Sequence, residues 1–196
     1  MLANRKEKIA IKALELFATN GFHDVSISDL QYDLDMGRGT MYYYFKNKED
    51  LFHYVMIQYF IIPKQTCLQV SETVTIPEMI ETLLSYLHSL ELLLDKFTNK
   101  NINTANVVMM MFTAYNYFPD LHRKAYRLHQ KELILWQRAI HNSIRLGDIR
   151  DDIPIETVAT MFTNIKDGYD TGKVNIMMDF TILAKQYYSL YELLKK

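Results

Sequence analysis

The stretch that decides the fold is Gly37-Arg38-Gly39-Thr40-Met41-Tyr42-Tyr43-Tyr44-Phe45. Two glycines leave the first turn of a short helix nearly bare of side chains. Met41 and Phe45 lie four residues apart, so they share a face that can enter a core. Arg38 and the tyrosines at 42 and 43 fall on the other side. A short helix with such a bare, aromatic flank suits close approach to a phosphate-lined groove.

Two further helix signals precede this stretch. Apolar residues recur at helical spacing over residues 5–20, and Gly21 then suits the left-handed position that ends a helix. Ser26-Ile27-Ser28-Asp29 is a capping box that begins a second short helix. In the four-residue break that follows, Asp35 tolerates the left-handed conformation and Gly37 is an acceptable N-cap. Three short helices with this turn predict a helix-turn-helix.

The rest of the chain predicts a larger helical domain. Asn47 with Asp50 caps a fourth helix, and longer helical segments follow. We expect breaks near Pro63 and at 75–77, 99–103, 118–120, 147–154 and 172–175, which leave about six more helices. With six glycines and four prolines in 196 residues, the chain has too few turn residues for an all-β protein. We predict an all-α protein of about nine to ten helices. Its helix-turn-helix domain spans residues 1–50 and its C-terminal helical bundle, for ligand and dimerisation, spans 51–196.

Composition and missing motifs remove several classes of function. Cys67 is the only cysteine, which excludes an intrachain disulfide and a four-cysteine zinc site. We interpret it as a buried or half-buried thiol, with a redox sensor as the lesser alternative. Metalloprotease, di-iron, nucleophile-elbow and Walker motifs are missing, so we predict no enzyme, no metal and no cofactor. No signal peptide and no membrane span is recognisable, so we expect a cytoplasmic protein.

The charge balance of the N-terminal part bears on any nucleic-acid reading. Residues 1–55 carry seven Lys or Arg (5, 6, 8, 12, 38, 46, 48) against eight Asp or Glu (7, 15, 24, 29, 33, 35, 49, 50). A DNA-binding domain more often has a basic excess. Affinity depends on where cations sit relative to phosphates, and we expect weak binding unless a second copy contributes.

Several motifs at fixed spacing resemble the DNA-binding domain of the tetracycline-repressor (TetR) family. They are Ala13-Leu14-Glu15-Leu16-Phe17-Ala18 followed by Gly21-Phe22, Ser26-Ile27 with Leu30, and Gly39-Thr40-Met41-Tyr42-Tyr43-Tyr44-Phe45 followed by Lys48-Glu49 and Leu51. The resemblance covers roughly residues 5–55, with weaker echoes at 118–121 and 147–152. Two positions depart from the family: Asp35 stands where a glycine is usual, and Gly37 where a capping serine is usual.

The resemblance implies a DNA-binding surface with two kinds of contact. Phosphate contacts are implied for Ser26, Tyr43, Tyr44 and Lys48, of which the first and last begin helices. Base-edge contacts are implied for Arg38, Gly39, Thr40 and Tyr42, with Gly37 capping their helix. Among these, Arg38 alone can make a bidentate contact with guanine. For Tyr44, packing against the first helix is an equal alternative.

The resemblance also implies a homodimer that places two third helices in successive major grooves, about 34–36 Å apart. It further implies a repressor that a small apolar or amphipathic effector releases from its double-stranded DNA operator. Candidate pocket residues are Tyr86, Met110, Phe112, Tyr115, Trp136, Phe162 and Tyr169, for which ordinary core packing is the alternative. Two final helices, roughly 154–171 and 176–195, carry apolar stripes that predict the dimer interface: Ile155, Val158, Phe162, Phe180, Leu183, Tyr187 and Leu190.

Two other functions stay open. One alternative to the repressor is an activator or a non-ligand-sensing DNA-binding protein of the same fold. The other is a helical protein-interaction module that has lost DNA binding. Salt-dependent binding to a DNA duplex distinguishes the second alternative from the first reading.

Overall fold

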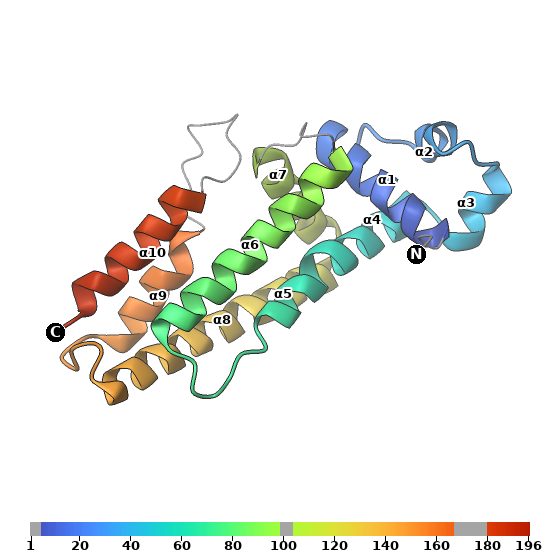
Figure 1. Ribbon diagram of the computed structural model, residues 1–196. Coiled ribbons are helices and arrows are strands. Elements are labelled where there is room, and N and C mark those ends of the chain that lie inside the picture. The colour runs from blue at the N-terminus through green and yellow to red at the C-terminus, as the bar shows by residue number, and fades with distance from the viewer. Residues whose placement is uncertain (1–4, 99–103, 167–179) are drawn as a thin grey trace. The chain divides into compact units, whose positions relative to one another are not determined.

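The protein is all-α, as predicted, in a computed structural model that describes residues 5–98, 104–166 and 180–196 (Figure 1). The helices are α1 (Arg5–Asn20), α2 (Ile27–Asp33), α3 (Arg38–Tyr44), α4 (Lys48–Met56), α5 (Ile62–Cys67), α6 (Ile76–Thr98), α7 (Thr104–Tyr117), α8 (Pro119–Leu146), α9 (Ile155–Ile165) and α10 (Phe180–Leu194), with a π-helical segment η1 (Ile57–Ile61) between α4 and α5. Two compact units emerge, Met1–Ile62 with Leu90–Lys124 and Pro63–Ser89 with Ala125–Lys196. The predicted domain boundary at residue 50 stays a prediction.

The first unit is built on α1. Its buried stripe includes Phe17, whose ring meets the ring of Phe52 on α4 edge-on at 5.0 Å. Gly21 ends α1 with φ 85, as predicted, and its N–H donates to the Phe17 carbonyl. Lys12 forms an ion pair with Asp33 at 3.0 Å, which joins α1 to α2. These contacts join α1 to α2 and to α4.

The predicted break at Pro63 is wrong, because the chain stays helical from Lys48 to Cys67. Proline lacks an N–H and its ring clashes with the carbonyl four residues back. The helix accommodates it by widening just before it: the N–H of Ile62 bonds to the carbonyl of Ile57, five residues earlier. The helical run ends at Cys67, and Thr75 then starts α6 by donating to the Glu78 carboxylate at 2.8 Å.

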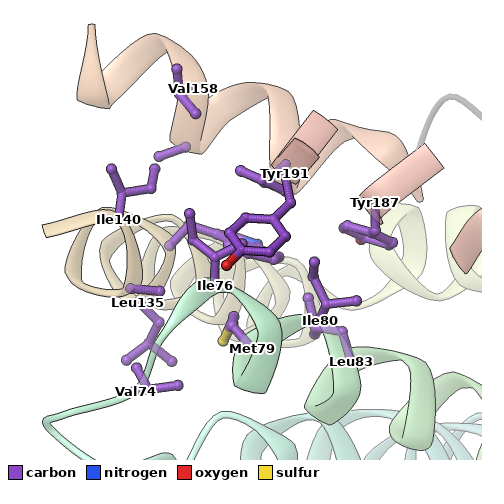
Figure 2. Packing of buried hydrophobic residues seen from close by; sticks show 14 of the residues in the cluster. Val74, Ile76, Met79, Ile80, Leu83, Leu135, Ile140, Val158, Tyr187 and Tyr191 are labelled. Atoms are coloured by element: carbon purple, nitrogen blue, oxygen red, sulfur yellow. The ribbon is translucent and has the colours of Figure 1, made fainter. Parts of the chain in front are cut away.

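The core of the second unit joins α6, α8, α9 and α10 (Figure 2). Trp136 is its largest fully buried side chain. It stacks on Phe162 at 4.4 Å and on Tyr187 at 5.9 Å, with interplanar angles of 11° and 15°. Each such buried side chain stabilises the fold by roughly 1.5–3 kcal/mol through removal of apolar area from water. This stack fixes how α8, α9 and α10 meet.

Polar contacts attach the 68–75 loop to α8. The Asn142 amide donates to the carbonyls of Glu72 and Val74 at 2.9 and 2.8 Å. The hydroxyl of Ser143 accepts from the Ile76 N–H at 3.1 Å. Both side chains are buried, so without these hydrogen bonds their polar groups would have no partner in the core.

The remaining predicted breaks can be compared one by one. The break at 75–77 is confirmed, because α6 begins at Ile76. The breaks at 118–120 and 147–154 are also confirmed, because they separate α7 from α8 and α8 from α9. The breaks at 99–103 and 172–175 lie outside the described residues. No described helix is both long and apolar enough to cross a membrane.

Candidate nucleic-acid interface

Helix α2 begins at a complete capping box. The Ser26 hydroxyl accepts from the Asp29 N–H at 3.2 Å, and the Asp29 carboxylate accepts from the Ser26 N–H at 2.7 Å. The bond from the Ser26 backbone is the main reason why the pKa of Asp29 is lowered. Ser26 is exposed, and its hydroxyl hydrogen is still available for donation to an incoming oxygen.

The turn between α2 and α3 depends on Asp35, as expected. Its φ of 48 makes it the only non-glycine residue in the left-handed region among the described residues. Two backbone bonds close the turn: Asp35 N–H to Tyr32 O at 3.2 Å and Met36 N–H to Gln31 O at 2.9 Å. Aspartate adopts this conformation more readily than most residues, so the departure from glycine leaves the turn intact.

Neither packing nor backbone conformation within the described structure requires glycine at positions 37 and 39, at the start of α3. Gly37 is the N-cap, as predicted, with φ −65 and ψ 150, a conformation open to any residue. A Cβ atom built on Gly37 or Gly39 would meet nothing within 4 Å. Glycine in a helix nevertheless costs roughly 0.5–1 kcal/mol relative to alanine. The described structure therefore does not itself require glycine at position 39.

Helix α3 has a buried face and an aromatic outer face. Met41 and Phe45 are fully buried, which confirms the predicted core face. On the outer face Tyr42 is 49% and Tyr43 is 82% exposed. Tyr44 is half-buried and meets the Tyr43 ring edge-on at 4.9 Å.

The other two base-facing candidates are described less fully. Thr40 is half-buried, and its N–H donates to the Gly37 carbonyl at 3.0 Å. Arg38 begins α3, and its side chain lies outside the described part of the structure. Its role in reading a base stays a prediction.

Lys48 makes internal contacts that the sequence did not predict. Its ammonium donates to the carbonyls of Phe22 and His23 at 2.9 and 3.3 Å. It also lies 4.5 Å from the centre of the Phe22 ring. Asn47 caps the same helix through the Asp50 N–H at 2.7 Å, as expected. A phosphate contact from Lys48 would therefore come from an ammonium that is already held in place.

Tyr32 is a further candidate that the sequence did not single out. It lies on α2 and is 88% exposed, more than any other large apolar side chain described. Leu30 is buried on the opposite side of the same helix. The sequence did contain a signal for this residue, because Tyr32 is an aromatic residue that lies between Leu30 and Leu34. In the structure Leu30 is buried and Leu34 is half-buried.

The predicted pocket residues fall into separate units. Trp136 and Phe162 meet as a stacked pair in the second unit, which also contains Tyr86. The first unit contains the predicted pocket residues of α7, which are the buried Met110, the exposed Phe112 and the half-buried Tyr115. Tyr169 lies outside the described residues.

The predicted dimer residues are mostly internal. Val158, Phe162, Leu183 and Tyr187 are buried in the core of their own chain, whereas Ile155, Phe180 and Leu190 are partly buried. Helices α9 and α10 lie side by side (Figure 1). The exposed apolar side chains of these two helices are Met161, Ile182 and Leu193. A partner surface on these helices would be made by that second set.

Comparison with known proteins finds one family model that is similar to the N-terminal helices. Residues 11–55 match the family model of bacterial regulatory proteins of the tetR family. No curated protein sequence matches the chain.

Solved structures match the whole chain at low identity. A TetR-family transcriptional regulator from Marinobacter aquaeolei VT8 is 17% identical, with 98% of this chain and 92% of that chain covered and a TM-score of 0.68. The SmeT–triclosan complex is 16% identical, with 97% and 91% covered and a TM-score of 0.67. A Saccharomonospora viridis protein in complex with choline is 18% identical, with 95% of each chain covered and a TM-score of 0.68. The fold is shared with these proteins over nearly its full length.

Proposed function

We propose that the chain is a DNA-binding transcriptional regulator of the tetR family and acts as a ligand-responsive repressor that binds a pseudo-palindromic operator as a homodimer. The operator is double-stranded DNA, and α3 is the helix that enters the major groove. A small apolar or amphipathic molecule bound by the C-terminal helices releases the DNA.

The observation that best supports the DNA-binding role is that α3 begins with two glycines, Gly37 and Gly39, which have no side chains. Gly39 has open space around it and no internal constraint, and it precedes the buried Met41 and the exposed Tyr42 and Tyr43 on the same helix. A glycine there lets the helix backbone approach a groove more closely than any other residue would. Tyr42 and Tyr43 flank that approach with exposed hydroxyls, which suit phosphate and base-edge contacts.

Dimerisation follows from the charge balance of the N-terminal part. Seven basic against eight acidic residues over 1–55 provide little general attraction to DNA. Two copies on successive half-sites double the number of specific contacts without a larger basic patch. The exposed Met161, Ile182 and Leu193 are the residues through which we expect α9 and α10 to meet a second copy.

Effector response has support from proteins of similar fold, one of which holds triclosan and another choline. An effector shifts the equilibrium only through its different affinity for the DNA-bound and released states. Along the chain, the helical run Lys48–Cys67 starts at the contact with Phe22 and ends in the second unit. We expect the effector to act through this helical run, so that a change of position at one end is passed to the other end.

The deciding experiment is titration of a labelled duplex from the region upstream of the gene at two salt concentrations. We expect saturable binding that weakens as salt rises, with the stoichiometry of two chains per site. An unrelated duplex of the same length is the control. Absence of binding would leave the protein-interaction module as the better interpretation, and equal binding to both duplexes would overturn the proposed operator in the upstream region.

A further inference from the structure

One side of α8 carries a row of basic residues around a single apolar one. Six residues recur at alternating steps of four and three, which places them along one side of the helix: Arg127, Lys131, Ile134, Arg138, His141 and Arg145. Arg138 is half-buried and the other five are exposed. We call these six residues the α8 face. At 1.5 Å per residue the α8 face is roughly 27 Å long.

No carboxylate of α8 neutralises this row. The opposite side of the helix enters the core through Trp136, Ile140 and Ser143, which are buried. Between residues 121 and 147 the only acidic residue is Glu132. Its side chain is 1% exposed, and its Oε2 lies 2.7 Å from the ammonium of Lys64. The positive charge of the α8 face is therefore not balanced within the helix.

The side chains of the α8 face have almost no partners within the chain. Arg127, Lys131, Arg138 and His141 form no hydrogen bond or ion pair with any residue that the structure describes. Arg145 is the exception, because its Nη2 donates to Oδ1 of Asn142 at 3.1 Å. That bond holds the guanidinium in place and leaves its other N–H groups available for a partner.

The α8 face uses arginine where the rest of the chain mostly uses lysine. The chain has fifteen lysines and seven arginines. Three of the seven arginines lie on the α8 face, against one of the fifteen lysines. Either residue keeps a surface soluble, but only arginine presents a planar fork of N–H groups that binds an oxyanion through two hydrogen bonds. The composition therefore indicates a partner that carries carboxylates or phosphates.

A second copy of the chain is not that partner. Two copies related by a two-fold axis bring the same patch of each chain together. The arginines of one α8 face would then meet the arginines of the other, and like charges across an interface oppose association. The α8 face is therefore not the surface through which two chains pair.

The apolar residues of this region favour carboxylates of a protein over phosphates. Protein interfaces are enriched in arginine and aromatic residues and depleted in lysine and in acidic residues. Tyr126 borders the row and is 60% exposed, and Ile134 at its centre is 56% exposed. A row of phosphates offers Ile134 nothing to pack against. The net charge of −1 also gives the chain no overall attraction to a large polyanion such as a duplex or an anionic bilayer.

We propose that the α8 face binds an acidic amphipathic helix of a second protein. That helix carries carboxylates one turn apart on both sides of one apolar residue. Arg127, Arg138 and Arg145 each bind a carboxylate, and Ile134 packs against the apolar residue. At physiological ionic strength exposed charges act over only about 8 Å, so the carboxylates must match the arginines in position as well as in number. This protein partner is additional to the operator and the effector proposed above.

The experiment titrates the full-length protein, without DNA, into fluorescein-labelled peptides of about 20 residues, long enough to form an alanine-based helix. The first peptide has glutamates one turn apart on one face with a leucine at the centre. The second has the same residues in scrambled order, and the third has alanine in place of the leucine. At an ionic strength near 0.15 M, fluorescence anisotropy should show saturable binding of the first peptide, about tenfold or more tighter than that of the scrambled peptide.

A matched pair of double variants locates the binding. Arg127→Glu with Lys131→Glu reverses two exposed charges of the α8 face and should weaken binding of the first peptide by about tenfold or more. Lys185→Glu with Lys196→Glu makes the same change of net charge at exposed positions elsewhere and should leave the affinity unaltered. Equal losses in the two double variants would overturn the proposal. If the first double variant does not fold, as judged by circular dichroism, the comparison of peptides on the natural protein decides alone.

The role of Ile134 is tested by a double-mutant cycle. Ile134→Ala should weaken binding of the leucine peptide several-fold and should hardly change binding of the alanine peptide, because the two apolar side chains are expected to contact each other. An equal effect of Ile134→Ala on both peptides would mean that the partner is recognised by charge alone, against the amphipathic helix proposed here.

Three further outcomes would overturn the proposal. No binding of any peptide would mean that the α8 face serves only solubility. Equal binding of the first and the scrambled peptide would mean that net charge is all that counts. A labelled duplex and phosphatidylglycerol vesicles are tested in parallel. If the α8 double variant loses binding to either of them while the control variant keeps it, the face binds phosphates instead.

Discussion

The ammonium of Lys48 lies 2.9 Å from the carbonyl oxygen of Phe22 and 4.5 Å from the centre of the Phe22 ring. One side chain at the start of α4 thus holds the segment that precedes α2. That segment ends at Ser26, the first of the residues proposed to meet DNA. Lys48 therefore affects DNA binding through the position of its neighbours as well as through its charge.

Replacing Lys48 by alanine should lower both stability and DNA affinity. Loss of a hydrogen bond from a charged group to a carbonyl is expected to reduce the free energy of unfolding by about 1 kcal/mol, since the side chain is half-buried. Urea denaturation measures this difference. Lys46→Ala, at an exposed neighbour, should leave stability nearly unchanged. Similar losses in both variants would contradict a structural role for Lys48.

Replacing Gly39 by alanine should move stability and function in opposite directions. Alanine in an exposed helix is favoured over glycine, so the free energy of unfolding should rise by roughly 0.5–1 kcal/mol. DNA affinity should fall because the added methyl group keeps the helix from the groove. Thermal denaturation and duplex titration on the same preparation test both parts.

Gly21→Ala is the contrasting variant. Its φ of 85 is unfavourable for any L side chain, so this change should destabilise the protein. Unchanged DNA affinity in the folded Gly39→Ala protein would show that the bare helix start is not needed for binding.

Replacing Arg38 by alanine should weaken binding by about 1–3 kcal/mol and relax the preference for one base pair. Without the guanidinium, only sequences that carry the matching guanine should bind more weakly, because other bases offer no such bidentate pairing. Titration against a set of duplexes with single base-pair changes measures the effect. A uniform loss over the whole set, as expected for Lys48→Ala, would assign Arg38 to the phosphates instead.

The contact between Asp120 and His53 should make stability depend on acid pH. Partial burial would raise the pKa of Asp120, but its hydrogen bonds with His53, at 2.8 Å, and Lys124 outweigh this and lower it below the ordinary 3.8. A carboxyl group with a lowered pKa stabilises the fold above its ordinary pKa. That stabilisation is lost as the pH falls through the lowered value.

Asp120→Asn should accordingly be less stable than the natural protein at neutral pH, with the difference shrinking below about pH 4. Urea denaturation at a series of pH values measures it. Asp152→Asn, at an exposed carboxylate, is the matched control. A difference between Asp120→Asn and the natural protein that does not change with pH would mean that ionisation of Asp120 is not what stabilises the fold.

Alkylation of Cys67 should be slow at neutral pH. Burial raises the pKa of its thiol, and this outweighs the opposite influence of Lys64. Only the thiolate reacts, so the rate should keep rising with pH beyond the range where a free cysteine levels off. Mass spectrometry after timed additions of iodoacetamide gives the rate. A plateau at the position of free cysteine would mean that the thiol is open to water.

The helix-turn-helix was predictable because its signals are local. The glycine after α1, the capping box at Ser26 and the left-handed Asp35 each involve contacts within a few residues. The partition of α3 into a buried and an open face follows from helical spacing alone. Each of these features needs no knowledge of distant parts of the chain.

The remaining features depend on partners far away in the sequence. Glu132 reads as a polar residue on an amphipathic helix, and only the fold places it against Lys64, 68 positions earlier. The apolar stripes of α9 and α10 are equally local in pattern, but their pattern does not say whether the partner is in the same chain or in a second copy. Most of those side chains proved to be internal.

Pro63 fixes more than the shape of one helix. A π-helical turn holds an additional residue compared with an α-helical turn, so it rotates all later side chains by about 100° relative to a regular helix. The direction in which Lys64 and Cys67 point is therefore set by a proline that is far from Glu132 and Trp136 in sequence. Within this helical run, a regular turn in place of the widened one would direct the Lys64 ammonium about 100° away from the direction in which it now meets the Glu132 carboxylate.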